Sequence, residues 1–123
     1  TISTFGDRLQ RMPEALPQML VALDWNLSTS KEIIIVGNPN SADTKLLFKE
    51  LFAHFIPHRI VLMVNRATEQ NRLQSYLPFI GEMTMVDGKA TAYICEHYAC
   101  QLPTTDNQVF AEALTRVDRR RQQ

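Results

Sequence analysis

The order of hydrophobic and polar positions predicts helices first and strands afterwards. Between Thr4 and Trp25, apolar residues recur at steps of three and four, as they do along one face of a helix. Pro13 and Pro17 interrupt this stretch, and proline suits the first turn of a helix but breaks its interior. We therefore expect two helices that meet near Pro13, the second ending near Trp25, followed by a polar linker over residues 26–30.

Three later segments have the composition of buried strands. Each is a run of β-branched or other apolar residues, at Ile33–Val36, Ile60–Val64 and Ala90–Cys95. Continuous apolar runs are typical of strands covered on both faces, and therefore of parallel sheets. A shorter run at Met83–Val86 predicts an edge strand, and the Asp-Gly pair that follows it predicts a turn.

An amphipathic segment follows the first strand. Asn40 or Ser41 caps the predicted helix, Asp43 lies near its positive end, and Pro57 ends it. Its buried stripe consists of apolar residues four positions apart, supported by two further phenylalanines. The stripe and its support are Leu47, Leu51, Phe55, Phe48 and Phe52.

Two more helices complete the pattern. A weaker one is predicted over Glu69–Ile80. The last helix follows Thr105 and Gln108, which have the spacing of a capping box. It ends in the basic segment Arg116–Gln123, where positive charge suits the helix dipole. Its predicted buried face consists of Val109, Phe110, Ala113, Leu114 and Val117.

Strands that alternate with helices indicate an α/β fold. We predict a three-layer α/β/α sandwich with a small, mostly parallel sheet over residues 31–123, preceded by an N-terminal helical segment over residues 1–30. The 123 residues suit one domain of this kind. The composition, 45% hydrophobic and 21% charged, is typical of a folded protein.

Charge and hydropathy exclude several classes of partner. Thirteen basic and thirteen acidic residues cancel, so charge gives no reason to expect binding to nucleic acid or to an anionic membrane. No apolar run reaches the roughly 18 residues of a membrane span. Two cysteines are too few for a secreted disulfide framework, which favours a reducing, cytoplasmic setting. Because the chain opens on a helical pattern without an initiator methionine, we interpret it as part of a longer protein.

Both cysteines lie in the stretch from Val86 to Asp106, which is rich in side chains capable of chemistry. Cys95 and Cys100 are five positions apart, which does not match the C-x-x-C of thioredoxin-type couples. Two alternatives stay open. In one, the cysteines form a disulfide, which would allow a redox switch. In the other, Cys95 packs as a small apolar residue and Cys100 is an inert, semi-exposed thiol.

The histidines and the turn after the first strand suggest no bound cofactor. His97 lies between the cysteines, but a structural zinc site takes four ligands, usually as separated pairs. His54 and His58 are separated by the helix breaker Pro57, so we expect no metal ion. The turn at Val36–Pro39 sits where anions bind in α/β proteins, yet it lacks the glycines of a dinucleotide motif and the Walker lysine. A tight turn is the simpler interpretation.

The candidates for catalysis are Lys89, Glu96, His97 and Cys100. Lys89 follows the Asp-Gly turn, where it could contact a phosphate or carboxylate at the mouth of a strand, or could simply lie in water. The spacing of residues shows no Ser-His-Asp set and no pair of carboxylates. An enzymatic role would require the four candidates to converge in one cleft.

Several stretches of the chain resemble one known family. They are Val86–Tyr93, Cys95, Ala99–Pro103, Ala15–Leu20 and Glu32–Gly37. The family is that of large thioredoxin-domain-containing proteins, which includes the spermatogenesis-associated, thioredoxin-like proteins of animals and their bacterial relatives. The resemblance implies an N-terminal thioredoxin-like domain, a six-hairpin (α/α) toroid similar to sugar epimerases and glycosidases, and a C-terminal α/β segment. This chain is similar to that last segment, with the final toroid helices at Thr4–Trp25.

The resemblance also limits what can be carried over, because the thioredoxin-like domain and most of the toroid have no counterpart here. It gives no catalytic role to the matching residues, which are Asp87, Gly88, Lys89, Tyr93, Cys95, Cys100, Gln101 and Pro103. We therefore expect a structural, non-catalytic domain whose partner is the remainder of its own full-length chain. Exposed N-terminal helices could also pair two copies as a homodimer. The alternative is that Lys89, His97 and Cys100 contribute to a carbohydrate- or thiol-directed active site of the full-length protein.

Overall fold

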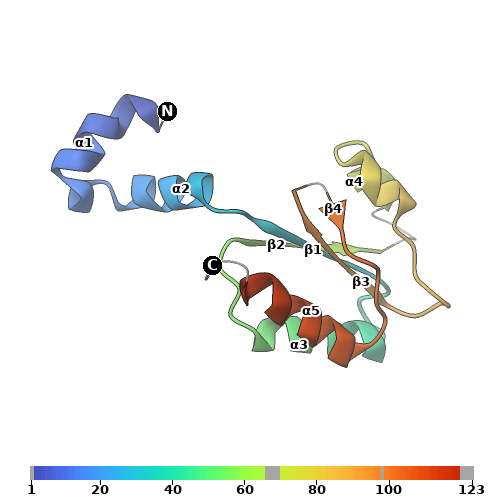
Figure 1. The fold of residues 1–123 in the computed structure, drawn as a ribbon. Coiled ribbons are helices and arrows are strands. Elements are labelled where there is room, and N and C mark those ends of the chain that lie inside the picture. Colours follow the sequence, from blue (N-terminus) through green and yellow to red (C-terminus); the bar gives the residue numbers. More distant parts are fainter. Residues whose placement is uncertain (1, 66–69, 98, 120–123) are drawn as a thin grey trace. The chain divides into compact units, whose positions relative to one another are not determined.

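The computed structural model describes residues 2–65, 70–97 and 99–119, the last three by their backbone alone. The chain divides into two compact units, Thr1–Ser30 and Lys31–Gln123 (Figure 1). No helix in the described part of the chain is both long enough and apolar enough to cross a membrane.

The first unit consists of short helices separated by prolines. In chain order they are the 3₁₀ helix η1 (Ser3–Phe5), α1 (Gly6–Arg11), the 3₁₀ helix η2 (Pro13–Ala15) and α2 (Pro17–Leu27). Pro13 and Pro17 begin η2 and α2, where the missing N–H group costs no intrahelical hydrogen bond. The prediction of two helices that meet near Pro13 is confirmed, although the second continues past Trp25 to Leu27.

The second unit is built on a four-stranded sheet. Its strands are β1 (Lys31–Val36), β2 (Arg59–Val64), β3 (Thr91–Glu96) and β4 (Ala99–Cys100). They lie in the order β2-β1-β3-β4, so β1 is a central strand and β2 is at an edge. The three apolar runs in the sequence correspond to the three long strands, and the predicted α/β class is confirmed.

The sheet is mixed, and the prediction of a mostly parallel sheet is wrong. β1 and β2 are parallel, but β1 is antiparallel to β3, and β3 is antiparallel to β4. The two connections differ in the length of their helices. α3 (Ala42–Ala53), with 12 residues, is about 18 Å long and can carry the chain back along a strand of about 20 Å. α4 (Gln70–Gln74), with 5 residues, is only about 8 Å long and does not span a strand, and the chain enters β3 at the end of the sheet where β2 finishes.

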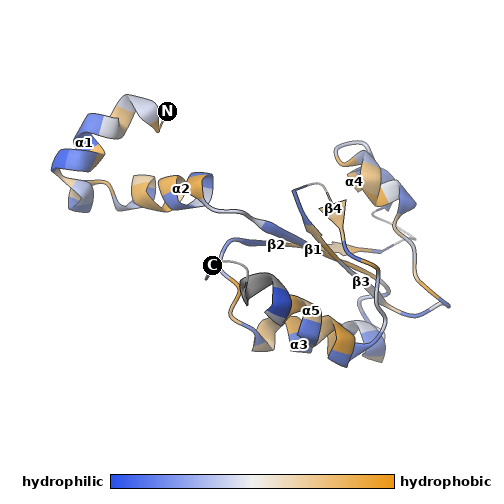
Figure 2. Cartoon of the chain, in the orientation of Figure 1, coloured by the Kyte–Doolittle hydropathy of each residue, from blue (hydrophilic) through white to orange (hydrophobic). Residues whose placement is uncertain are grey.

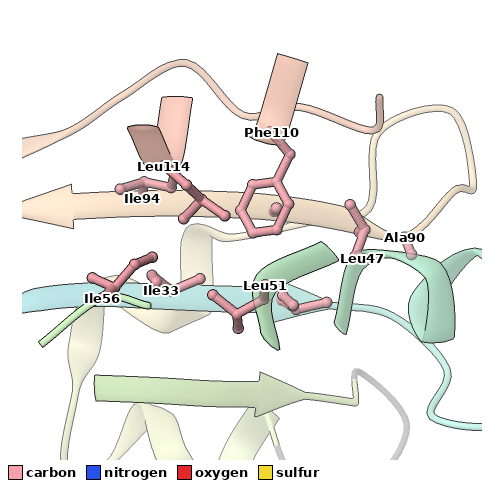
Figure 3. Close-up of a cluster of buried hydrophobic side chains, with 10 residues drawn as sticks. Ile33, Leu47, Leu51, Ile56, Ala90, Ile94, Phe110 and Leu114 are labelled. Carbon is pink, nitrogen blue, oxygen red and sulfur yellow. The ribbon is translucent and has the colours of Figure 1, made fainter. Parts of the chain in front are cut away.

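The larger hydrophobic core lies on the face of the sheet covered by α3 and α5 (Asn107–Arg119) (Figure 1). Figure 3 shows Phe110 and Leu114 of α5 pointing toward Leu47 and Leu51 of α3. This core consists of Ile33, Ile35, Leu47, Leu51, Ile56, Ala90, Ala92, Ile94, Phe110 and Leu114. Alternate residues of β1 and β3 supply its floor, because side chains alternate between the two faces of a strand.

The opposite face carries a smaller core under short elements. Its buried members are Ile34, Val36, Val64, Ile80, Met83 and Cys95. Leu73 of α4 and Leu77, which precedes the 3₁₀ helix η3 (Pro78–Glu82), pack against them. Because this cover is short, a complete three-layer sandwich stays a prediction.

The segment between β2 and β3 differs from its prediction. In place of one helix over Glu69–Ile80 the chain forms α4 and then η3, and Glu69 lies outside the described residues. The buried amide of Gln70 donates hydrogen bonds to the carbonyls of Ile80 and Met83 at 3.0 and 3.1 Å, which ties η3 to α4. The run Met83–Val86 is not a strand, and only its last residue forms a bridge, to Lys89.

α3 begins where the sequence predicts and ends earlier. Ser41 is its N-cap residue, and Leu47 and Leu51 are buried as predicted. Phe55 lies beyond the last helical residue and is 89% exposed, so its place in the buried stripe is wrong. Phe52 is 61% exposed although the adjacent Leu51 is fully buried, because successive residues of a helix point to different sides.

α5 is capped by a different residue from the one predicted. The N–H groups of Gln108 and Val109 donate to Asp106 Oδ1 at 2.8 and 3.0 Å, which is the geometry of an N-cap. The capping box at Thr105 is wrong, because α5 begins at Asn107 and its first-turn N–H groups already have Asp106 as their acceptor. The preceding Thr104 is bridged to Ala92 of β3.

The buried face of α5 is partly as predicted. Phe110 and Leu114 are buried and Ala113 is partly buried, whereas Val109 is exposed. The structure does not describe the side chains of Val117 or of the rest of the basic segment, so their predicted positions stay predictions.

Candidate functional site

β3 and β4 form a tight hairpin crossed by a disulfide. Glu96 pairs with Ala99, and the strands are joined by residues 97–98. His97 has φ +51°, a left-handed conformation that two-residue hairpin loops require. The N–H of Gln101 donates to the carbonyl of Ile94 at 2.9 Å, so the neighbouring pair, Cys95 and Cys100, occupies a non-hydrogen-bonded position. Side chains are closest at such positions, and the Sγ atoms of the two cysteines are bonded.

The interpretation of the cysteines as two free thiols is therefore wrong, and the disulfide alternative is confirmed. Cys95 is 1% exposed and belongs to the smaller core, whereas Cys100 is exposed on β4. A spacing of five residues does not reveal this pairing. It depends on the hairpin turning within two residues, which places the cysteines opposite each other.

The length of β3 separates Lys89 from the other three candidates. Lys89 is exposed just before β3, after a turn in which Asp87 and Gly88 both have positive φ, as the Asp-Gly pair predicts. Glu96 and His97 lie at the far end of that strand, about 20 Å away along the extended chain. Within this unit the candidates do not form one cleft, and the chemical role of each one stays a prediction.

The N-terminus of α3 lies next to the turn that resembles an anion site, and an acidic side chain occupies it. Asp43 Oδ2 accepts a hydrogen bond from the N–H of Ala90 at 2.8 Å, and Oδ1 accepts one from Thr44 at 2.9 Å. The bond from Ala90, followed by one from Ser41, lowers the pKa of Asp43. A carboxylate of the chain itself therefore accepts hydrogen bonds at this tight turn.

Gly37 explains why that turn contains a glycine. A Cβ atom at this position would lie 2.5 Å from Thr44 Oγ1 and 3.1 Å from the Cβ of Ala90. The glycine therefore permits close packing of α3 and β3 against the end of β1. This packing explains the glycine without a bound ligand.

A pocket of about 260 Å³ lies between β3, α5 and the segment 101–104. Ala92 and Ile94 form its floor, and Leu102 lies on the segment that walls it. Glu112 and Arg116, an exposed ion pair at 3.5 Å, stand at its rim. The sequence gives no signal for this pocket, because its walls come from segments that only the fold brings together.

The described residues include no group of three or more His, Cys, Asp or Glu side chains placed to hold a metal ion. In particular, the disulfide uses both sulfur atoms of the C-x-H-x-x-C stretch.

Together the mixed sheet, its helices and the disulfide hairpin define residues 31–123 as a small α/β domain. Over 105 residues the chain is 35% identical to spermatogenesis-associated protein 20 of Rattus norvegicus and 34% identical to the protein of that name from Homo sapiens. Each match covers 85% of this chain and 13% of the relative, so the chain is homologous to one part of a much longer protein. No family model and no solved structure matches the chain.

Proposed function

We propose that this chain is a non-catalytic, accessory α/β domain with a helical lead-in, and that it packs against the rest of a longer protein. The observation that carries the proposal is that α2 buries none of its eleven residues. Figure 2 shows hydrophobic residues along much of this helix. Val21 is 53% exposed and Leu27 76% exposed, and Leu20 and Trp25 are exposed as well.

An unburied apolar helix of this length needs a surface to pack on. Isolated helices shorter than about 12–15 residues are marginal in water, and helices in proteins owe most of their stability to a packed apolar face. The first unit supplies little of that surface, since Leu9 is the one buried hydrophobic residue among its described residues. α2 therefore has the properties of an element that a larger structure completes.

The α/β unit has an apolar surface of its own beside its edge strand. The rings of Phe48 and Phe52 stack at 6.0 Å, and the guanidinium of Arg59 at the start of β2 lies 5.2 Å from the centre of the Phe52 ring. Phe55 is exposed in the turn between α3 and β2. Clusters of exposed aromatic residues are characteristic of interaction surfaces.

We propose that the remainder of the longer protein covers these surfaces, because the chain spans 13% of the length of its relatives. A second copy of the chain, which would form a homodimer through α2, is the competing occupant. A cytoplasmic location stays a prediction that rests on the low number of cysteines, and the Cys95–Cys100 disulfide does not support it.

Hydrogen exchange tests the proposal directly. The amides of α2 should be protected in the full-length protein and exchange freely in the isolated chain. Val21 and Trp25 are four positions apart and share a helix face, so V21S/W25S should lower the melting temperature of the full-length protein by several degrees. Gln18→Ser, an exposed polar position of the same helix, is the matched control and should leave it unchanged.

Two results would overturn the proposal. One is an α2 that exchanges as fast in the full-length protein as in the isolated chain. The other is a dimer of the full-length protein, measured by sedimentation equilibrium, that V21S/W25S dissociates into monomers.

The active-site alternative has less support. Lys89 lies at the opposite end of β3 from His97 and Cys100, so those three side chains do not line one cleft within this domain. Lys89 is exposed, so its substitution by alanine should change the unfolding free energy of the full-length protein by no more than about 0.5 kcal/mol.

A further inference from the structure

We propose that the Cys95–Cys100 disulfide is a site of thiol–disulfide exchange, and that a dithiol reductant attacks it at Cys100. The asymmetry of the two cysteines supports this site. Cys100 is exposed on a strand of two residues, whereas Cys95 is 1% exposed among the apolar side chains of the smaller core. Because Cys100 as a residue is exposed and Cys95 is buried, we expect an incoming thiolate to attack at Cys100, since access decides which sulfur of a disulfide is attacked.

The exchange proceeds in two balanced steps. A thiolate of the dithiol bonds to Cys100 Sγ, the Sγ–Sγ bond breaks, and Cys95 leaves with the electron pair and takes up a proton, since its apolar surroundings disfavour a charge. The second thiol of the reductant, as its thiolate, then attacks its own sulfur in the mixed disulfide. Cys100 leaves with that electron pair and is protonated, and the reductant becomes a cyclic disulfide.

A dithiol is the class of reductant that suits this geometry. After the first step Cys95 still lies opposite Cys100 in the hairpin. It can therefore attack the mixed disulfide and restore the original bond. A second thiol on the reductant competes with Cys95 because it is tethered at the same place, whereas a monothiol must be replaced by another molecule from solution.

The segment that the disulfide holds is also a wall of the pocket. After the hairpin, Gln101 bonds to the carbonyl of Ile94 and Thr104 exchanges two backbone hydrogen bonds with Ala92, at 2.8 and 3.1 Å. Leu102, between them, is exposed and lines the pocket against α5. Reduction removes the covalent link at the start of this segment and leaves it held by those few hydrogen bonds. The redox state of the hairpin therefore sets how firmly the pocket wall is held.

The experiment compares dithiothreitol with 2-mercaptoethanol at equal thiol concentration on the intact, natively folded protein, followed by acid quenching, alkylation and peptide mapping. Dithiothreitol should reduce the disulfide fully without denaturant, and the adduct trapped with 2-mercaptoethanol should be on Cys100. After reduction, the amide of Gln101 should exchange about tenfold faster, while the amide of Gly37, bonded to Val64 in the sheet, should not change.

Two variants separate exposure from folding. Cys95→Ala should leave a Cys100 thiol that reacts with maleimide in the folded protein, whereas Cys100→Ala should leave a Cys95 thiol that reacts only after denaturation. The proposal is overturned if 2-mercaptoethanol forms its adduct on Cys95, or if the disulfide is reduced no faster than the protein unfolds globally. It is also overturned if the protein isolated under oxidising conditions lacks the disulfide, or if reduction leaves the hydrogen exchange of the Gln101 amide unchanged.

Discussion

At the scale of single residues, the turn after β1 shows how a functional-looking feature can be structural. Gly37, Asp43 and Thr44 lie together where a strand ends and a helix begins, the place where many α/β proteins bind anions. Here Asp43 accepts a hydrogen bond from the N–H of Ala90, which precedes β3 and lies 47 positions away in the sequence. The turn thus joins distant parts of the chain.

The carboxylate of Asp43 should make stability depend on acidity. Because its pKa is lowered in the folded state, the ionised group stabilises the fold above the pKa of the unfolded chain, about 3.9, and this contribution is lost as the pH falls through the lower, folded pKa. Asp43→Asn should lower the unfolding free energy by about 1 kcal/mol at neutral pH, a small value because the group is well solvated. Urea unfolding from pH 7 to strong acid measures this, and the difference from the parent protein should shrink below pH 4 or so.

The control for that experiment is Asp87→Asn. Asp87 lies in the exposed turn with positive φ, where asparagine is equally suitable. An equal loss in both variants, or a difference at Asp43 that persists unchanged in acid, would contradict the role assigned to the Asp43 carboxylate.

Gly37 should tolerate no side chain. In Gly37→Ala the new methyl group meets the hydroxyl of Thr44, a buried and stiff β-branched residue, and we expect a loss of about 1–3 kcal/mol. Gly6→Ala, where a Cβ atom has open space, should be neutral or slightly stabilising. Chemical denaturation measures the unfolding free energy of each variant. If the double variant G37A/T44A loses at least as much unfolding free energy as the two single variants together, the contact with Thr44 is not the cause of the loss.

At the scale of elements, tertiary links decide where helices begin and end. Thr104 is bridged to Ala92 just before α5, and the cap of the helix is Asp106 in place of Thr105. α4 stops after five residues, and the buried Gln70 of α4 is hydrogen-bonded to the carbonyls of Ile80 and Met83 further along the chain. In both cases the boundary of the helix is accompanied by contacts to residues that are not its near neighbours in sequence.

The two candidate caps of α5 can be compared by substitution. Asp106→Ala should cost about 1 kcal/mol of unfolding free energy, because two N–H groups in the first turn lose their acceptor. Thr105→Ala, the substitution at the cap expected from sequence, should remain within about 0.5 kcal/mol of the parent. Thermal or urea unfolding measures both, and a larger effect at Thr105 would restore the capping box.

At the scale of the whole molecule, the hydrophobic core is confined to one of the two units. The described residues include two buried clusters, and every member lies within residues 31–123. The first unit adds Leu9 alone. The α/β unit therefore has the core of an independent domain, and the helical lead-in does not.

This division predicts the behaviour of fragments. Residues 31–123 expressed alone should unfold cooperatively, with a free energy within about 1 kcal/mol of the whole chain, since that fragment retains both clusters. Residues 1–30 alone should show little helical circular dichroism, because short helices without a packed face are marginal. A fragment 31–123 that lacks a cooperative transition would show that the lead-in is part of the domain's core.

The sequence alone determined the long strands, the central part of α3 and of α5, and the turn at Asp87-Gly88, because each depends on periodicity or on backbone preferences among near neighbours. Only the tertiary structure decided the direction of β3, the pairing of Cys95 with Cys100, the exposure of Phe55 and the pocket under residues 101–104. These depend on how far each connection reaches and on which segments then meet, and such distances are properties of the folded chain as a whole.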